Sequence, residues 1–260
     1  MQHVSCPQAF RHMVREGQYK SHTSGQAQGF LQCNLVIVPE AYARAFELFC
    51  KKNAKACPLI AKSLPGSYDL PELGDIDLRF DVPSYEIFEH GERVRQENSI
   101  ESLWRDDFVA FALGCSYSFE EAFLNAGLEI RNITDDVCVP MYRTRIRCEP
   151  VPPFDGQVVV SMRPFLPGDV QSAIDISSCF PKVHGAPLHV GDPVTLGIND
   201  LNTPDFGCAI NLKEDEVPLF WACGVTPQLA LLSAKLPLAI THSPGCMLVT
   251  DIKNDALKIY

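Results

Sequence analysis

Residues 221–251 alternate short apolar runs with breaks built from small and turn-forming residues, WACGVTPQLALLSAKLPLAITHSPGCMLVTD. Each run has the length of a strand or a short helix, and none reaches the roughly 18–20 apolar residues of a membrane-spanning helix. The breaks carry polar and reactive side chains: Cys223, Thr226, Gln228, Thr241, His242, Cys246 and Asp251. The segment therefore predicts buried strands and a helix, with reactive groups at the turns between them.

Periodicity along the rest of the chain predicts both helices and strands. Apolar residues three to four apart, with turn-forming residues at the ends, predict helices over residues 5–17, 40–53, 100–114, 118–127 and 167–180. Short apolar or alternating runs between turns predict strands over residues 34–39, 57–66, 84–92, 139–148, 156–165 and 186–191. We therefore expect an α/β protein.

The middle of the chain differs in its order of elements. Two strands, a helix and a further strand follow one another from about residue 136 to residue 195. This order predicts a small two-layer α+β domain inserted into a larger α/β domain. We expect a discontinuous main domain of residues 1–135 and 196–260, and an inserted domain of residues 136–195.

The charge balance limits the partners that the surface can attract. With 22 basic and 32 acidic residues, the formal net charge is −10. Such a chain is a poor match for nucleic acid or for an anionic membrane surface, and we expect neither as a partner. A local cluster of arginines could still bind a small anion, so a small carboxylate remains the expected ligand. The sequence leaves open whether the protein is a homo-oligomer.

Eleven cysteines are present, without a C-x-x-C pair or the Cys/His spacing of a zinc site. We expect no metal and no disulfide framework, because the N-terminus lacks the apolar core of a secretory signal. The thiols are predicted to be reduced and mostly buried as small core residues. A cytoplasmic protein is expected, with the mitochondrial matrix as the alternative if a presequence has been removed.

Two features of residues 221–251 can be read as chemistry or as structure. Thr226 before Pro227 is typical of a helix start, where free N–H groups bind anions, but a capping threonine gives the same pattern. His242 follows a short apolar strand, and its imidazole is suited to proton transfer near neutral pH. A structural histidine at a strand end is the alternative.

Residues 114–123, GCSYSFEEAF, hold a second group of candidates between two predicted helices. Ser118 and Glu121 have the spacing of a capping box, which gives both a structural explanation. Cys115, Ser116 and Glu120 have no such explanation. A thiol beside a helix N-terminus is expected to have a lowered pKa, so Cys115 is a candidate nucleophile.

An arginine cluster is the strongest candidate for binding a carboxylate. Arg143, Arg145 and Arg147 alternate along one predicted strand and therefore share a face, and Arg163 lies on the next strand. Guanidinium groups bind carboxylates through paired hydrogen bonds. The alternative is a solvated stripe of charge.

Several longer segments together resemble a known family. TSGQAQGFLQCNLVIVP, FVAFALGCSYSFEEAF, VVVSMRPF, GDPVTLGINDL, VPLFWACGVTPQ and ITHSPGCMLVTD resemble the hydro-lyase family that includes the D-glutamate cyclases. The resemblance covers nearly the whole chain and implies a two-domain α/β fold. It also implies loss of water from D-glutamate to give 5-oxo-D-proline. Two departures are visible: Cys246 stands where many relatives have histidine, and the second domain of some eukaryotic relatives is absent.

Lactam closure requires a deprotonated amine, an electrophilic γ-carboxyl group and a proton for the departing hydroxide. We expect catalysis without metal or cofactor by acid, base or nucleophilic side chains, namely His242, Glu120, Cys115 and Thr241. Groups suited to holding the substrate are Arg143, Arg163, Ser116, Thr226 and Gln228. The alternatives are a non-catalytic module that binds a small carboxylate, and a hydro-lyase for another small carboxylic acid.

Overall fold

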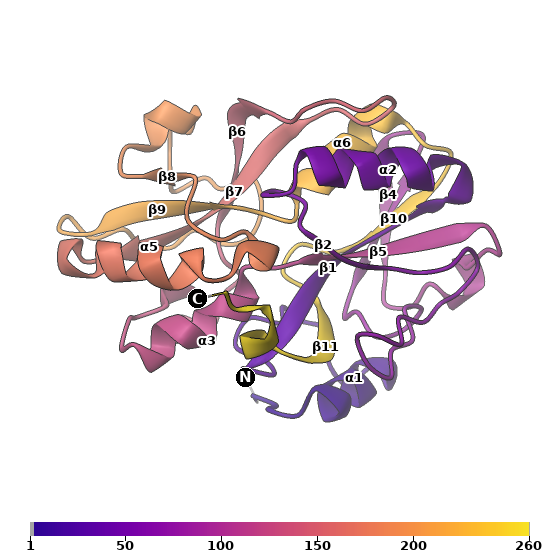
Figure 1. Cartoon of the computed structure of the whole chain (residues 1–260), viewed down its shortest axis with the longest axis horizontal. Helices are drawn as coiled ribbons and strands as arrows, with labels where there is room; N and C mark the ends of the chain where they lie inside the picture. Colours follow the sequence, from indigo (N-terminus) through magenta and orange to yellow (C-terminus); the bar gives the residue numbers. More distant parts are fainter. Residues whose placement is uncertain (1–2, 260) are drawn as a thin grey trace.

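Two antiparallel sheets organise the chain in the computed structural model, which describes residues 3–259. The larger sheet has its strands in the order β2 (Leu59–Lys62), β5 (Phe108–Gly114), β1 (Phe30–Pro39), β10 (Ala239–His242), β3 (Tyr85–Glu89) and β4 (Glu92–Glu97), and β11 (Leu248–Lys253) also pairs with β1. The smaller sheet has the order β6 (Met141–Arg147), β7 (Gln157–Phe165), β9 (Val217–Ala222) and β8 (His189–Val190). The smaller sheet lies to the left in Figure 1 and most of the larger sheet to the right.

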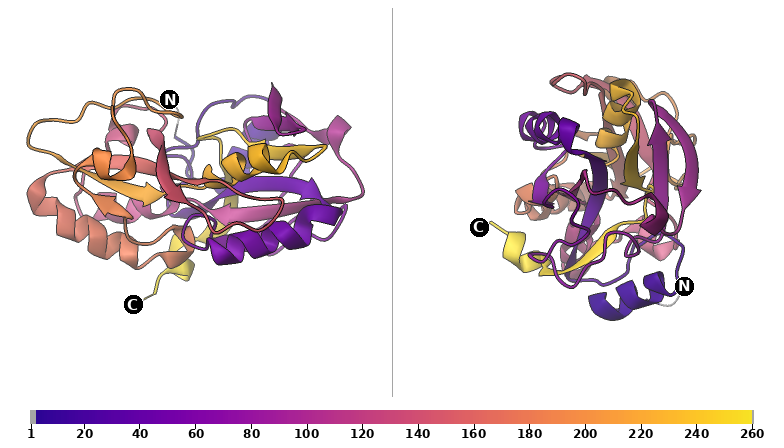
Figure 2. Two further views of the ribbon diagram at one scale, coloured as in Figure 1. Left: turned by 90° about the horizontal axis from the view of Figure 1, so that it is seen from above. Right: turned by 90° about the vertical axis from the view of Figure 1, so that its right-hand side faces the viewer.

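Six α-helices flank the sheets: α1 (Pro7–Arg15), α2 (Glu40–Lys52), α3 (Tyr117–Asn125), α4 (Arg131–Thr134), α5 (Val170–Ser178) and α6 (Thr226–Ala234). Short 3₁₀ turns cover Glu101–Leu103, Pro167–Asp169, Pro181–Val183, Pro193–Leu196 and Asn254–Leu257. Helices α2 and α5 run along the same side of the elongated molecule in the left view of Figure 2. The expectation of a mixed helix-and-strand fold is therefore confirmed.

Strand β1 is the centre of the larger sheet. Nine of its ten residues are buried, because both of its faces are covered by apolar side chains. Val36 lies opposite Phe111 of β5 on one side and opposite Thr241 of β10 on the other. The register of β10 therefore fixes which face of the sheet Thr241 and His242 each occupy.

Residues 100–114 differ from expectation. They form the 3₁₀ turn Glu101–Leu103 and then strand β5, instead of one helix. Every residue of β5 is buried, because β1 and β2 flank it and both of its faces are covered. A run that is apolar at every position does not distinguish a helix period from a strand period, and here it forms a doubly covered strand.

Both expected helix caps are wrong. Helix α3 begins at Tyr117, and the Oγ of Ser118 accepts a hydrogen bond from the Gln32 backbone N–H at 2.9 Å. Helix α6 includes Thr226 as its first residue, and the Thr226 Oγ1 accepts from the Val159 N–H at 3.0 Å. Each hydroxyl group therefore binds a neighbouring strand and ties its helix to a sheet.

The expected division into domains remains a prediction. The smaller sheet contains β6, β7 and β8, which all come from residues 136–195. It also contains β9, which comes from the sequence assigned to the main domain and pairs with β7 over six residues. A boundary drawn at residue 195 would therefore separate two paired strands.

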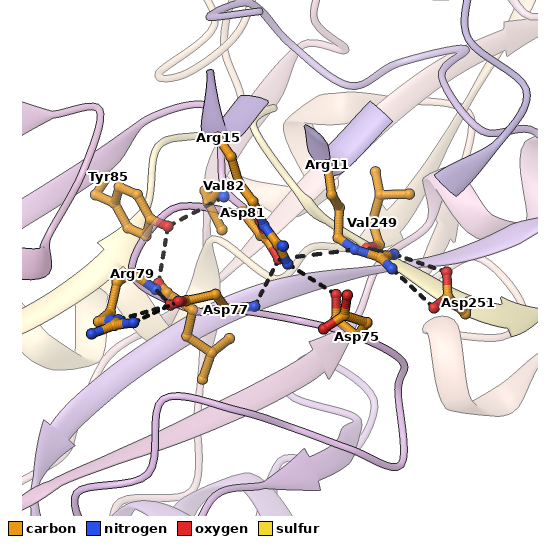
Figure 3. A network of polar contacts seen from close by, with 11 residues as sticks. Arg11, Arg15, Asp75, Asp77, Arg79, Asp81, Val82, Tyr85, Val249 and Asp251 are labelled. Carbon is orange, nitrogen blue, oxygen red and sulfur yellow. Dashed lines mark hydrogen bonds and ion pairs between the residues drawn. The ribbon is translucent and has the colours of Figure 1, made fainter. Parts of the chain in front are cut away.

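Ion pairs from Arg11 and Arg15 connect helix α1 to the rest of the fold (Figure 3). The Arg11 guanidinium donates to both carboxylate oxygens of Asp251 on β11, at 2.9 Å each, and to the Val249 carbonyl. Arg15 pairs with the buried carboxylate of Asp81. Burial raises the pKa of Asp81, and the hydrogen bond from Arg15 opposes that rise. The N-terminal helix is thus an integral part of the fold.

Two further expectations concern the state of the cysteines and the presence of a membrane-spanning helix. All eleven cysteines are free thiols and eight of them are buried, which agrees with their expected place in the core. Within residues 3–259, no helix combines the length and the apolar character needed to cross a membrane.

Candidate active site

The candidate residues fall in two places, and the first is a buried ion pair. Arg163 on β7 donates from Nε to the Oε1 of Glu120 on α3 at 2.8 Å, and its Nη2 atom lies 2.5 Å from the same oxygen. The two residues are only 1% and 2% exposed. Two further N–H groups of Arg163, on Nη1 and Nη2, donate to the hydroxyl groups of Ser161 and Ser116, both at 3.1 Å.

The surroundings of this pair are apolar. The Arg163 guanidinium lies 5.7 Å from the ring centres of both Phe119 and Trp221. Burial raises the pKa of Glu120, and the charge of Arg163 opposes that rise. The Oε2 atom of Glu120 is buried and has no hydrogen-bond partner among the described residues. The pair can therefore hold or exchange a proton at Oε2, while Oε1 is fixed by Arg163.

Cys115 lies near this pair, but its thiol is not activated. Burial raises its pKa well above the ordinary value, although the helix N-terminus predicted a lowered pKa. Burial likewise raises the pKa of Cys223 to about 11. The expected lowering of the Cys115 pKa is wrong, because removing the thiolate from water raises the pKa more than the nearby backbone N–H groups lower it. Both thiols are protonated near neutral pH.

The second place is an open groove of about 290 Å³. Its wall consists of β3–β4, β6, α6 and the loop before β9, with the lining residues Glu86, Phe88, Arg93, Arg143, Asp205, Phe206, Gln228, Leu229 and Leu232. Two ion pairs face into it. The Arg93 Nη1 donates to the Glu86 Oε1 at 2.8 Å. The Arg143 Nε lies 3.5 Å from the Asp205 Oδ1.

The groove combines charge of both signs with apolar surface. The Arg143 and Asp205 side chains are 49% and 38% exposed, so water reaches both. The guanidinium carbon of Arg143 also lies 5.5 Å from the ring centre of Phe206. Glu86 is buried behind its arginine and is only 5% exposed.

His242 and Thr241 lie on β10, beside the groove. The His242 Nδ1 accepts from the Leu35 backbone N–H at 3.1 Å, and Nε2 has no partner among residues 3–259. Burial lowers the pKa of His242 to about 4, so the near-neutral titration expected for it is wrong. Thr241 donates its hydroxyl to the His242 carbonyl at 2.9 Å, and Gln228 Nε2 donates to the same oxygen at 2.9 Å.

The expected cluster of four arginines is divided. Arg143, Arg145 and Arg147 are exposed on β6, but the register is irregular between Arg143 and Arg147 and Ile146 is exposed as well, so a single shared face is not established. Arg163 is buried in the other region and pairs with Glu120. Of the sequence candidates, Arg143 and Gln228 line the groove, whereas Glu120, Arg163 and Ser116 form the buried cluster. The catalytic and binding roles of these residues remain predictions.

Sequence reasoning missed Glu86, Arg93 and Asp205 in the groove. A signal existed for Glu86, because an acidic residue inside the otherwise apolar strand β3 needs a partner. Arg93 lies opposite Phe88 in the β3–β4 hairpin and reaches the Glu86 carboxylate two residues along β3, a contact that depends on the register. Asp205 comes from an irregular loop and had no local signal.

His184 was missed as well. It is buried with a positive φ of 85°, and its Nδ1 lies 2.8 Å from the Lys55 carbonyl. Burial lowers its pKa to about 4. Within the described part of the chain, no three His, Cys, Asp or Glu side chains are grouped as a metal site would require.

Comparison with known proteins gives the family. The family model for D-glutamate cyclase matches residues 109–251. A protein of Burkholderia multivorans named "Putative hydro-lyase" is 52% identical over 255 residues, covering 98% of each chain. Another with that name, from Burkholderia ambifaria, is also 52% identical, over 98% of this chain and 99% of its own length.

A relative from Bradyrhizobium diazoefficiens, also named as a hydro-lyase of this kind, is 52% identical over 91% of this chain and 88% of its own. Among solved structures, a nitrogen repressor-like protein from Methanococcus jannaschii has a TM-score of 0.41 at 11% identity, over 92% of this chain and 96% of its own. That score is too low to support an inference about fold or function. The sequence relatives cover almost the full length at about half identity, and the chain therefore belongs to the hydro-lyase family that the D-glutamate cyclase model describes.

Proposed function

We propose that this protein is a hydro-lyase that converts D-glutamate to 5-oxo-D-proline and water. In this proposal the substrate binds in the open groove that Arg143 lines. In this reaction the substrate amine attacks its own γ-carboxyl carbon. One C–N bond forms, one C–O bond breaks, and the departing oxygen leaves as water with the two protons released by the nitrogen. Family membership supports the reaction class, and the groove supports the kind of substrate.

One observation carries the proposal: the groove presents two arginines and two carboxylates around apolar side chains. D-Glutamate has two carboxylates and one ammonium group on a short chain of methylenes. The arginines suit its carboxylates, and the carboxylates suit its ammonium group. A volume of about 290 Å³ is ample for a ligand of this size.

Arg143 is the proposed partner of the substrate's α-carboxylate. Its contact with Asp205 is at 3.5 Å and exposed to solvent, so a bound carboxylate can displace it at little cost. Gln228 of α6 also lines the groove, and its Nε2 already donates to the His242 carbonyl at 2.9 Å. We propose that this hydrogen bond keeps the Gln228 side chain fixed and leaves its Oε1 available to the substrate ammonium group.

Glu86 is the proposed proton acceptor and donor. Its carboxylate lies in the groove wall and is almost fully buried, and Arg93 holds its Oε1 at 2.8 Å. A carboxylate so placed can take a proton from the ammonium group and return one to the departing hydroxide. Holding the substrate curled between the two arginines brings its amine and γ-carboxyl carbon together.

The buried residues receive supporting roles in this proposal. Glu120, Arg163, Ser116 and Cys115 are buried and do not line the groove, and Thr226 ties α6 to β7. Thr241 and His242 bind backbone groups in the described structure. We propose that these residues hold α3, α6 and β10 in place, and that the groove residues contact the substrate.

Incubation of the purified protein with D-glutamate and with L-glutamate, followed by chiral chromatography of 5-oxoproline, tests the proposal. We expect 5-oxo-D-proline from D-glutamate and much slower turnover of the other enantiomer. A thermal-shift measurement with the same ligands runs in parallel. No product from either enantiomer would contradict the proposal, and stabilisation without turnover would assign the groove to carboxylate binding alone.

A further inference from the structure

Several buried oxygen atoms without hydrogen-bond partners in the described part of the chain belong to Glu120 and to residues near it. The unpaired atoms among residues 3–259 include Gln32 Oε1, Glu120 Oε2, Asn132 Oδ1 and Asn254 Oδ1. All four residues are at most 5% exposed. Buried acceptors are normally paired, so four in one neighbourhood require an explanation.

Three of these residues line one narrow cavity. Gln32, Glu120 and Asn254 surround it together with the loop of residues 25–30, Tyr117, Glu121 and Ile133. Asn132 adjoins it through a hydrogen bond of 3.3 Å to Glu120. The space measures about 10 Å³, which is enough for one water-sized occupant. None of the residues that line this cavity lines the groove.

The orientation of two amide groups is fixed by their other contacts. Gln32 Nε2 donates to the carbonyls of Thr23 and Gln26, at 3.1 and 2.9 Å. Asn132 Nδ2 donates to the Ser24 Oγ at 3.0 Å and to Glu120. Rotating either amide by half a turn would bring two oxygen acceptors together. The oxygens of Gln32 and Asn132 are therefore held as acceptors. Because Gln32 lines the cavity, an occupant that contacts its oxygen must be a hydrogen-bond donor or a cation.

The charges near the cavity favour a cation. Two carboxylates, Glu120 and Glu121, line it, and Arg163 neutralises one of them. No basic residue is among those that line the cavity in the described chain, although the Lys253 Nζ lies 4.0 Å from the ring centre of the lining residue Phe30. A water molecule donates only two hydrogen bonds, whereas an ammonium ion donates four. A potassium ion donates none and is coordinated directly by the lone pairs of oxygen atoms. A divalent ion normally recruits more carboxylates or retains its own waters, for which this space has no room.

We propose that this cavity, which we call the Glu120 cation site, binds one monovalent cation of the size of ammonium or potassium. The ligands are the unpaired oxygens of Gln32, Glu120 and Asn254, with Asn132 holding Glu120 in place. The site is separate from the groove and does not depend on the reaction proposed there. A bound cation would connect α3, β1 and the turn that begins at Asn254.

Thermal unfolding in chloride salts at equal ionic strength tests the site. We expect potassium or ammonium to raise Tm in a saturable way relative to choline, with lithium much less effective. Crystals grown in thallium or rubidium salt should show an anomalous peak between Gln32, Glu120 and Asn254. Equal Tm in every salt, with no anomalous peak, would identify the occupant as water and overturn the proposal.

Two variants locate the effect. Asn254→Ala removes one oxygen ligand and Glu121→Gln removes a negative charge, and we expect each to raise the half-saturating cation concentration at least about tenfold. Asn202→Ala is the matched control, at an exposed loop position where the side-chain amide donates to Asp200, and it should respond as wild type does. A salt response that persists unchanged in both cavity variants would place the cation elsewhere and overturn the proposal.

Discussion

Two of the arginine–carboxylate pairs in the molecule have similar chemistry in opposite surroundings. Arg163 and Glu120 are 1% and 2% exposed and lie among aromatic rings. Arg143 and Asp205 are 49% and 38% exposed at the edge of a groove. The first pair has lost its contact with water, and the second keeps it. This difference decides which pair can exchange its partner for a substrate.

The energetic consequences follow from solvation. Removing one member of a buried pair leaves an unpaired charge without water, which typically costs about 3–5 kcal/mol. An exposed pair contributes only about 0–1 kcal/mol. A substrate carboxylate can therefore displace Asp205 from Arg143 readily, whereas it cannot displace Glu120 from Arg163 without disrupting the core. We therefore propose a structural role for Arg163 and a role in substrate recognition for Arg143.

The largest expected effect is on stability. Arg163→Met should lower the free energy of unfolding by about 3–5 kcal/mol, because Glu120 would be left buried and unpaired. The same substitution at the exposed site, Arg143→Met, should change it by less than about 0.5 kcal/mol. Urea unfolding monitored by circular dichroism measures both. Equal losses from the two variants would remove the distinction between the pairs.

The next effect is on substrate affinity. Arg143→Met should raise the KM for D-glutamate about 10- to 100-fold, which corresponds to loss of one hydrogen-bonded charge contact. The value of kcat should change much less, because the α-carboxylate is bound equally before and during the reaction. Steady-state kinetics of 5-oxoproline formation give both numbers. An unchanged KM would return Arg143 to the role of a solvated surface charge.

The smallest expected effect concerns pH and tests the place of His242 in the interior. Its pKa in the folded protein is about 4, below the ordinary unfolded value near 6.5, so unfolding takes up a proton at mildly acidic pH. The stability that the neutral His242 contributes is present above pH 6.5 and declines as pH falls towards 4. Between pH 7 and pH 5, wild type should lose about 2 kcal/mol more than His242→Asn. Parallel pH profiles of the two proteins would contradict this assignment.

Local sequence signals predicted many of the elements. Helices α1 and α2 and strand β1 lie within or close to their expected ranges, because each has clear periodicity and turn-forming ends. Strand β5 was mistaken for a helix because all of its residues are apolar. The pairing of β9 with β7 joins segments about 50 residues apart, which no local pattern encodes.

The site shows the same limit. The strand predicted around Arg143, Arg145 and Arg147 is present as β6, and all three arginines are exposed. The burial of Arg163 could not be predicted, because it depends on α3 and β9 packing against β7. For the same reason, the sequence suggested reactive groups at Cys115 and His242, whose pKa values are shifted by burial away from neutral pH.

The central claim is that acid–base chemistry takes place in the groove. Its most direct test is the kcat for D-glutamate of Glu86→Gln, with Glu89→Gln as the matched control on the exposed part of the same strand. We predict a loss of about 100-fold or more for Glu86→Gln, the usual scale for a general acid or base, and nearly unchanged turnover for Glu89→Gln. Full activity of a folded Glu86→Gln variant would contradict the claim.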